Sequence, residues 1–274
     1  MKNFTYKGLM APVFTAYHDD KDKTVNYEII EPYAKHLKQK GVNAVLVNGT
    51  SGEGMLMNVL ERKQVTEAWK KACDVAGIVL MVQIGGAPYP DVIELAKHAE
   101  KLQVDGVLCL PELYFKPKSP EKLTDYLKNV AVYCSSIPFF YYHIPMFTDV
   151  NVHMPTFLDM AEQAIPNFSG IKYTSGDLDQ GSGCLKPSRT IFLGADSILC
   201  GAVAAGFDSF IMTTLNICPE ISNEIIECVN SGRLDMAREK QKQLNSKITE
   251  ILKHGKNVKK IFVDCCRYRK LLKL

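Results

Sequence analysis

The sequence has no excess of either sign of charge, because 33 Lys and Arg residues face 30 Asp and Glu residues. A formal net charge of +3 gives no reason to expect nucleic acid or an anionic membrane as a partner. No apolar run approaches the roughly 18 residues that cross a membrane, and the N-terminus lacks the core of a signal peptide. We therefore expect a cytoplasmic protein, and interpret the Lys-rich residues 253–273 as a solvated helix face rather than a patch for an acidic partner.

Motifs for metal binding and hydrolysis are also missing. The nine Cys residues are an odd number without a C-x-x-C pair, and Cys109 and Cys200 lie in apolar runs, as buried reduced thiols do. The six His residues are scattered and form no H-E-x-x-H motif, so we expect no metal site. The absence of a G-x-S-x-G elbow argues against a Ser/His/Asp hydrolase.

Short apolar runs recur along the chain instead. The 274 residues, 46% of them hydrophobic, suffice for one large core, and a (β/α)8 barrel needs about 250 residues. Most runs are continuous rather than alternating, which is typical of parallel strands covered on both faces. We predict eight strands from these runs, at residues 8–15, 42–48, 78–84, 106–110, 138–143, 169–173, 190–193 and 209–213.

The segments between the runs have apolar residues at helical spacing, as residues 92–102 do, and become short after the sixth run. Ser119 before Pro120 is typical of an N-cap and a first helical position. We predict an α/β fold, a (β/α)8 TIM barrel over residues 1–218. The last barrel helix and a shortened C-terminal helical extension would follow at 219–274, in the same domain. A doubly wound open sheet is the alternative, but no G-x-G-x-x-G motif follows the first strand.

Barrel enzymes place their chemistry at the C-terminal ends of the strands. The second predicted strand ends in the turn at residues 48–54, Asn-Gly-Thr-Ser-Gly-Glu-Gly. Three glycines and two hydroxyl groups that lead into a helix can aim backbone N–H groups at an anion. An ordinary polar turn has the same composition, so the motif alone leaves both interpretations open.

The fifth predicted strand contains Tyr141 and Tyr142 in succession, followed by His143. Consecutive residues of a strand point in opposite directions, so one phenol should face the barrel interior. An inward phenol near the end of the strand can transfer a proton, whereas either tyrosine could equally be a core residue whose hydroxyl group is hydrogen-bonded. We interpret His143 as a packing or capping residue rather than a base.

Lys172 is the most unusual residue of the predicted strands, because it lies within the apolar sixth run. An unpaired buried ammonium group is costly, and a barrel interior gives a lysine little opportunity to extend to solvent. Schiff-base formation requires a neutral amine, and burial lowers the pKa of a lysine toward that form. Lys172 is therefore a candidate nucleophile for a ketone substrate.

Three segments carry a family resemblance when they are taken together. Residues 49–53 (Gly-Thr-Ser-Gly-Glu), 142–145 (Tyr-His-Ile-Pro) and 170–177 (Gly-Ile-Lys-Tyr-Thr-Ser-Gly-Asp) occur in order on predicted strand ends. The chain resembles the dihydrodipicolinate synthase/N-acetylneuraminate lyase superfamily from about Gly8 to Asn216, and within it is similar to the animal-type lyases. The resemblance implies a class I aldolase without a cofactor or metal.

The same resemblance implies roles for residues of the reacting centre. Lys172 would form the Schiff base with pyruvate or with the keto group of sialic acid. Thr50 and Ser51 would hold the pyruvate carboxylate, and Tyr142 would shuttle the proton of the sugar hydroxyl group whose C–C bond breaks.

A further set of residues would contact the rest of the substrate. Thr174 would face the substrate beyond the Schiff base, and Gly194, Asp196 and Thr213 match sugar-binding positions. Tyr114 corresponds to a tyrosine that family members lend to a neighbouring subunit, which implies a homo-oligomer, a tetramer of paired dimers.

The sequence also departs from the family pattern. Where the lyases commonly have Gly-x-Asp-Glu, this chain has Ser197 in place of the glutamate, and Met212 adds bulk where the family has none. Residues 146–149 contain no arginine, which disfavours the dihydrodipicolinate synthases, in which an arginine grips the aldehyde's carboxylate. Relatives continue beyond Leu274 for about another helix, and Cys265-Cys266 near the end resembles no known motif.

Three functions remain as hypotheses. The first is cleavage of N-acetylneuraminate to pyruvate and N-acetylmannosamine. The second is cleavage of another 2-keto-3-deoxy sugar acid, and the third is a barrel without turnover that serves as a binding or scaffold protein. Because Ser197 is shorter than glutamate and neutral, we expect a weakened grip on the sugar tail, with Met212 occluding part of the pocket.

Overall fold

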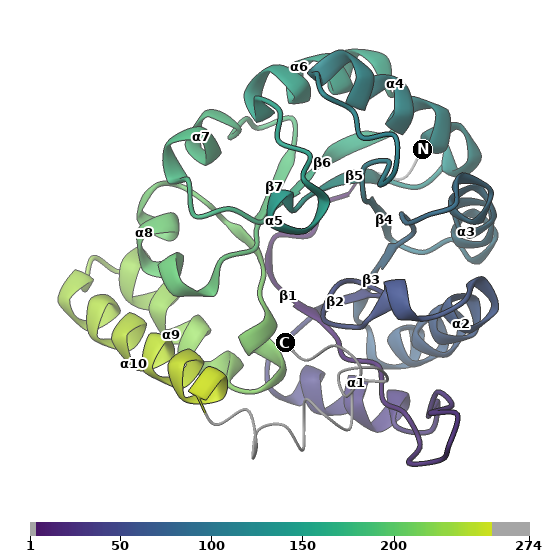
Figure 1. Cartoon of the computed structure of the whole chain (residues 1–274). Helices are drawn as coiled ribbons and strands as arrows, with labels where there is room; N and C mark the ends of the chain where they lie inside the picture. Colours follow the sequence, from purple (N-terminus) through teal and green to yellow (C-terminus); the bar gives the residue numbers. More distant parts are fainter. Residues whose placement is uncertain (1–3, 254–274) are drawn as a thin grey trace.

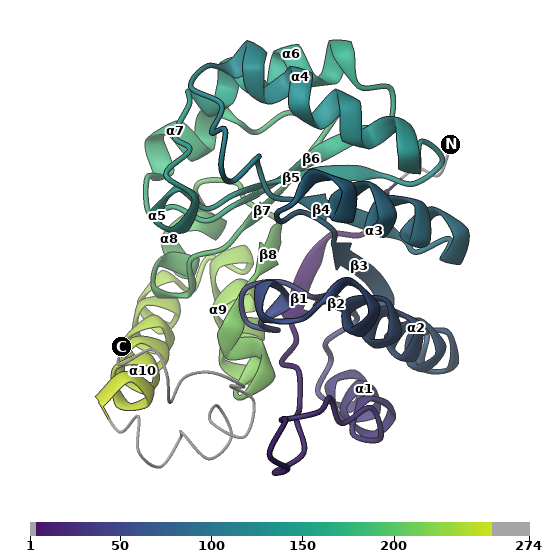
Figure 2. The ribbon, with the colours of Figure 1, turned by 45° about the vertical axis from the view of Figure 1, so that its right-hand side comes forward.

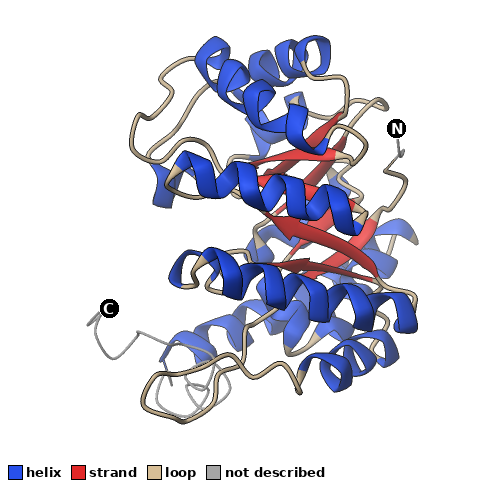
Figure 3. Ribbon diagram, turned by 90° about the vertical axis from the view of Figure 1, so that its right-hand side faces the viewer, coloured by secondary structure: helices blue, strands red, loops and turns tan. Residues whose placement is uncertain are grey.

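The protein is a closed barrel of eight parallel strands with helices around it (Figures 1 and 3). The computed structural model describes residues 4–253. Each strand pairs with its neighbours in sequence, and β8 closes the barrel by pairing with β1. The predicted TIM barrel is confirmed, and the open doubly wound sheet is wrong. The strands are β1 (Gly8–Pro12), β2 (Ala44–Val47), β3 (Val79–Gln83), β4 (Gly106–Cys109), β5 (Phe139–His143), β6 (Phe168–Tyr173), β7 (Thr190–Leu193) and β8 (Ser209–Ile211).

The helices lie outside the strands, and α7 and α8, which flank β7, have only six residues each, as the short intervals predicted. Within residues 4–253, four 3-10 helices supplement the α-helices: η1 (Gly54–Leu56), η2 (Val132–Cys134), η3 (Asp196–Ile198) and η4 (Thr213–Asn216). The α-helices are α1 (Ile30–Gln39), α2 (Val59–Ala76), α3 (Tyr89–Leu102), α4 (Pro120–Ala131), α5 (Pro145–Thr148), α6 (Met154–Ala164), α7 (Leu178–Gly183), α8 (Leu199–Ala204), α9 (Pro219–Asn230) and α10 (Leu234–Lys253).

Local sequence accounts for where the longer helices begin. Ser119 is the N-cap of α4, and its hydroxyl group accepts a hydrogen bond from the backbone N–H of Lys122. Asn58 caps α2 in a capping box, in which the Glu61 side chain accepts from the Asn58 backbone N–H in return. These caps fix where the chain leaves each strand-to-helix loop, and therefore where the loop residues lie.

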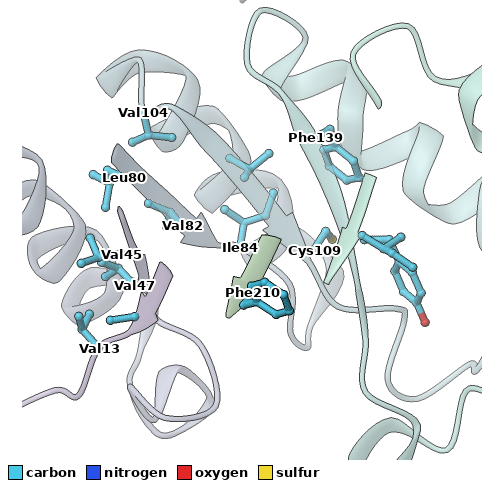
Figure 4. Close-up of a cluster of buried hydrophobic side chains, with 14 of the residues drawn as sticks. Val13, Val45, Val47, Leu80, Val82, Ile84, Val104, Cys109, Phe139 and Phe210 are labelled. Carbon is cyan, nitrogen blue, oxygen red and sulfur yellow. The ribbon is translucent and has the colours of Figure 1, made fainter. Parts of the chain in front are cut away.

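Alternation along the strands divides the buried residues into two cores. The outer core lies between the strands and the helices, and ten of its residues are labelled in Figure 4. The inner core fills the barrel, because in a closed sheet every second side chain points inward. The inner core comprises Met10, Ala44, Leu46, Met81, Leu108, Leu110, Phe140, Tyr142, Ile144, Phe192 and Ile211.

Aromatic residues close the N-terminal end of the barrel. Phe4 packs edge-on against Phe140 and Phe192, with ring centroids 4.9 and 5.9 Å apart. Tyr6 also packs against the inner core. The polar interior residues lie on the other side of these aromatic residues, toward the C-terminal ends of the strands, where barrels bind substrates.

Beyond β8, α9 and α10 pack side by side against the barrel (Figure 2). The predicted basic face at 253–273 and the Cys265-Cys266 pair lie outside the described residues. Within 4–253, no helix is long and apolar enough to cross a membrane. The described part of the chain also has no group of three or more His, Cys, Asp or Glu side chains placed to hold a metal ion.

Candidate active site at the mouth of the barrel

Lys172 lies inside the barrel, near the C-terminal end of β6. Its neighbours Ile171 and Tyr173 belong to the outer core, so Lys172 points inward, and only 5% of it is exposed. Gly170, two positions before Lys172, has a φ of 142°. A Cβ atom at Gly170 would collide with the carbonyl oxygen of Thr190. Only glycine suits such a backbone, and it lets β6 and β7 approach closely beside the lysine.

Tyr142 is the hydrogen-bond partner of the lysine. The Lys172 Nζ donates a hydrogen bond to the Tyr142 hydroxyl group at 3.0 Å. The same hydroxyl group lies 3.0 Å from the Thr50 Oγ1, so lysine, phenol and threonine form one hydrogen-bonded chain. Tyr141 points the other way and packs on Phe157 in the outer core. The structure thus selects Tyr142 as the inward phenol, a choice that the strand pattern alone had left open.

The outward residues of β5 are isolated from solvent. Burial raises the pKa of the Tyr141 phenol well above its ordinary value, and its hydroxyl group has no hydrogen-bond partner. His143 stacks on Tyr173, with ring centroids 5.3 Å apart, and burial lowers its pKa to about 4. His143 is therefore a neutral packing residue at neutral pH, as predicted.

The glycine-rich turn after β2 is tightly packed over the barrel mouth. A Cβ atom at Gly52 would lie 2.8 Å from the Val13 carbonyl oxygen, and one at Gly54 would collide with the Asn48 carbonyl. Asn48 itself donates from Nδ2 to the Arg62 carbonyl oxygen at 3.0 Å. Asn48 therefore anchors the turn to α2.

The helix expected directly after this turn is the short η1, whereas α2 begins later with its own capping box. Any anion site at the turn therefore depends on the turn itself and not on the N-terminus of α2. The Ser51 hydroxyl group lies 3.1 Å from the Thr213 Oγ1. This contact joins the turn to η4, which follows β8.

Thr174 and Gly194 lie next to the lysine on the opposite wall. A Cβ atom at Gly194 would lie 2.7 Å from the Thr174 Oγ1 and 3.3 Å from the Lys172 Cε. The Thr174 hydroxyl oxygen is buried without a hydrogen-bond partner. The absence of a side chain at Gly194 thus gives Thr174 and the lysine stem their room, and leaves one polar atom available to a ligand.

Asp196 and Ser197 lie farther out, on η3. The Asp196 Oδ1 accepts from the backbone N–H and the hydroxyl group of Thr214, at 2.9 and 2.5 Å. From α10, Gln241 and Asn245 donate to the carbonyl oxygens of Asp196 and Ser197. This wall is therefore fixed from outside by a helix beyond the barrel, while Ser197 remains exposed.

Two residues do not join the cluster around the lysine. Met212 is fully buried in the outer core, because it follows the inward-facing Ile211. The prediction that Met212 occludes the pocket is wrong. Tyr114 is 80% exposed in the loop between β4 and α4, where its ring packs on Phe115.

The sequence interpretation missed one polar residue of the interior. Gln83 ends β3 and is 1% exposed, between Val82 and Ile84 of the outer core. The alternation of apolar, amide and apolar side chains at 82–84 is the signal that could have identified it.

Comparisons with known proteins agree with this geometry. Residues 5–266 match the model of the Dihydrodipicolinate synthetase family. This chain belongs to that family. The resemblance inferred from the three motifs is thereby confirmed.

Several proteins similar to this chain are named N-acetylneuraminate lyases. N-acetylneuraminate lyase B of Xenopus laevis is 33% identical over 238 residues, 86% of this chain and 89% of that protein. The human N-acetylneuraminate lyase is 30% identical, over 91% of this chain and 79% of its own length. Among solved structures, the N-acetylneuraminate lyase (sialic acid aldolase) of Aliivibrio salmonicida is 35% identical and superposes with a TM-score of 0.87, covering 93% of this chain and 84% of that one.

Proposed function

We propose that this protein is a class I aldolase that cleaves N-acetylneuraminate into pyruvate and N-acetylmannosamine. The observation that carries the proposal is the hydrogen-bonded chain that runs from the buried Lys172 through the buried Tyr142 to Thr50 at the exposed rim. It combines a nucleophilic amine with a phenol that can exchange protons at the same place. The names of the relatives support the choice of substrate.

The reaction would begin with attack of the neutral Lys172 amine on the keto carbon, which gives a protonated imine and, with one proton from Tyr142, releases the keto oxygen as water. The imine draws electrons from the neighbouring C–C bond and so stabilises the enamine that forms when this bond breaks. Tyr142 would remove the proton of the sugar hydroxyl group and later protonate the enamine. Its position 3.0 Å from the lysine nitrogen suits a group that serves both steps.

Binding of the substrate would use both walls of the mouth. Thr50, Ser51 and nearby backbone amides would hold the carboxylate. On the opposite wall Thr174 would offer its unpartnered hydroxyl oxygen to the substrate beyond the imine. Gly194, Asp196, Ser197 and Thr213 would surround the sugar tail, for which Asp196 retains the carboxylate oxygen that does not bind Thr214.

A second candidate substrate is another 2-keto-3-deoxy sugar acid. It is favoured by Ser197, an exposed neutral residue where the family pattern has glutamate. The reacting carbons lie at the other end of the substrate, so the Lys172 chemistry would be the same. Parallel assays with N-acetylneuraminate and a keto acid truncated in the tail distinguish the two candidates.

Borohydride trapping tests the aldolase proposal itself. Incubation with pyruvate and borohydride should add a pyruvate-derived group to Lys172, located by peptide mass spectrometry, and Lys172→Ala should abolish both the adduct and turnover. Lys186→Ala is a matched control, because Lys186 binds Asp159 on the surface and should not affect labelling. A wild-type protein that stays unlabelled would favour the scaffold hypothesis.

We also propose a cytoplasmic homotetramer. A reducing compartment suits the seven described cysteines, none of which forms a disulfide bond. The exposure of Tyr114 and Phe115 suits a contact with a second subunit, in which Tyr114 would reach the neighbouring site. Light scattering should give the mass of a tetramer, and a fully active monomer at micromolar concentration would contradict this assembly.

A further inference from the structure

Gln83 occupies the barrel interior but has no part in the chemistry described so far. Its neighbours Val82 and Ile84 both point to the outer core (Figure 4), so its own side chain points inward. On the outer side, the Arg62 guanidinium donates to the Gln83 carbonyl oxygen at 2.8 Å. The end of β3 is thus held from outside, with the amide directed into the barrel.

The strand register places this amide at the height of the reacting groups. In a (β/α)8 barrel, stagger between strands puts interior side chains from alternate strands into common layers. The observed pairing of the strands, combined with this stagger, gives one layer that contains Pro12, Gln83, Tyr142 and Gly194. Lys172 belongs to the layer just below and reaches up to the Tyr142 hydroxyl group. Gln83 and Tyr142 are the two polar side chains of the upper layer.

The Gln83 Oε1 is buried and has no hydrogen-bond partner. An unpartnered buried acceptor is costly, since it has lost its water without gaining a protein donor. A residue that retains such an atom in the layer next to that of the nucleophile is suited to a donor that arrives during the reaction. Pyruvate has no O–H or N–H group, so that donor is not pyruvate itself.

One donor that arises during imine formation is the oxygen that leaves the keto carbon. The Lys172 nitrogen bonds to the carbon, the C=O double bond becomes a hydroxyl group, and one amine proton moves to that oxygen. The hydroxyl group then leaves as water with a proton from Tyr142, while the nitrogen lone pair forms the C=N bond of the protonated imine. Hydrolysis of the imine reverses these steps. The oxygen on the keto carbon therefore carries an O–H group during both imine formation and imine hydrolysis.

We propose that Gln83 is a positioning residue whose amide oxygen accepts a hydrogen bond from this hydroxyl group and from the water that leaves or attacks. The inference rests on the proposed function, because it requires the Lys172 imine. Imine formation and imine hydrolysis share one transition state, which a residue that holds the water would stabilise. Loss of this residue should therefore slow both reactions equally and leave the equilibrium between ketone and imine unchanged.

Loss of ¹⁸O from pyruvate labelled at the keto oxygen measures this step alone, since each exchange requires one imine formation and one hydrolysis but no C–C cleavage. Gln83→Met has similar volume and no acceptor, and should slow enzymatic exchange about tenfold. The fraction of enzyme trapped by borohydride at saturating pyruvate should stay unchanged. Gln83→Glu keeps an acceptor oxygen at the same reach and should retain most of the rate.

Two controls complete the experiment. Met81→Leu changes an apolar interior residue of the same strand and should exchange at the wild-type rate. Lys172→Ala gives the background of spontaneous exchange. If Gln83→Met exchanges ¹⁸O at the wild-type rate, the proposal is overturned. If that variant in addition cleaves N-acetylneuraminate more slowly, the amide instead binds a sugar hydroxyl group. Wild-type protein without exchange above background would instead refute the aldolase function.

Discussion

The inner and outer faces of the same strands differ in what they contribute. Tyr142 faces inward and bonds to Lys172 and Thr50, whereas the adjacent Tyr141 packs on Phe157 with its hydroxyl group unpartnered. On β6 the inward Lys172 likewise alternates with the outward Ile171 and Tyr173. A shift of one position along a strand therefore separates residues of the candidate site from residues of the outer core.

This difference means that the two faces should respond to mutation in different ways. Polar inner residues near the mouth contact one another through hydrogen bonds at the candidate site, and should affect activity more than stability. Outer residues bury apolar surface against the helices and should affect stability more than activity. Adjacent positions provide matched pairs with which to test this.

The adjacent tyrosines give the largest expected contrast. Tyr142→Phe removes the proton-transferring hydroxyl group and should lower kcat by about 10²–10⁴-fold, since general acid–base groups contribute that much. Tyr141→Phe removes a hydroxyl group without a partner and should leave kcat unchanged. Steady-state kinetics with N-acetylneuraminate measures both variants, and equal losses in the two would refute the division between the faces.

Met212, directly after β8, tests the outer core. Met212→Ala should lower the free energy of unfolding by about 2–5 kcal/mol, because it leaves a cavity in the outer core. The KM for N-acetylneuraminate should not change, since the side chain points away from the mouth. Urea denaturation and kinetics on the same preparation measure the two quantities. A lower KM at unchanged stability would return Met212 to the sugar pocket.

The buried His143 on the outer face of β5 should make the stability of the protein depend on pH. Its pKa of about 4 in the folded protein lies below the value of about 6.5 in an unfolded chain. The unfolded state therefore binds more protons between these values, so stability falls as the pH drops from about 6.5 to 4, by up to about 3 kcal/mol. His143→Phe keeps the ring stacked on Tyr173 and should remove this part of the pH dependence, measured by denaturation at a series of pH values. An unchanged pH profile in the variant would contradict the assignment.

Ser197 gives the smallest expected effect, because it lies at the exposed rim. Ser197→Glu should lower the KM for N-acetylneuraminate by about ten- to a hundredfold, since a charge-assisted hydrogen bond is worth about 1.5–3 kcal/mol. The KM of a tail-truncated keto acid should stay the same, which makes that substrate the control. A KM that falls equally for both substrates would show that the added charge acts on the reacting end instead.

Much of this protein was determined by local sequence. Continuous apolar runs predicted all eight strands, because parallel strands covered on both faces require apolar residues throughout. Three motifs on strand ends identified the family, and the lysine in an apolar run marked the interior nucleophile. These features could be inferred because each depends on neighbours within a few residues of the chain.

The tertiary structure decided which face each residue occupies and what it meets there. The strand pattern alone could not choose between Tyr141 and Tyr142, a choice that only the family resemblance made, and the sequence placed Met212 in the sugar pocket rather than in the outer core. The reason is that a shift of one residue in register reverses every side chain. Asp196 meets Thr214, and Gln83 lies level with Tyr142, only because the barrel closes and its strands are staggered. Such contacts join distant parts of the chain, and their geometry depends on closure of the whole sheet rather than on any local pattern.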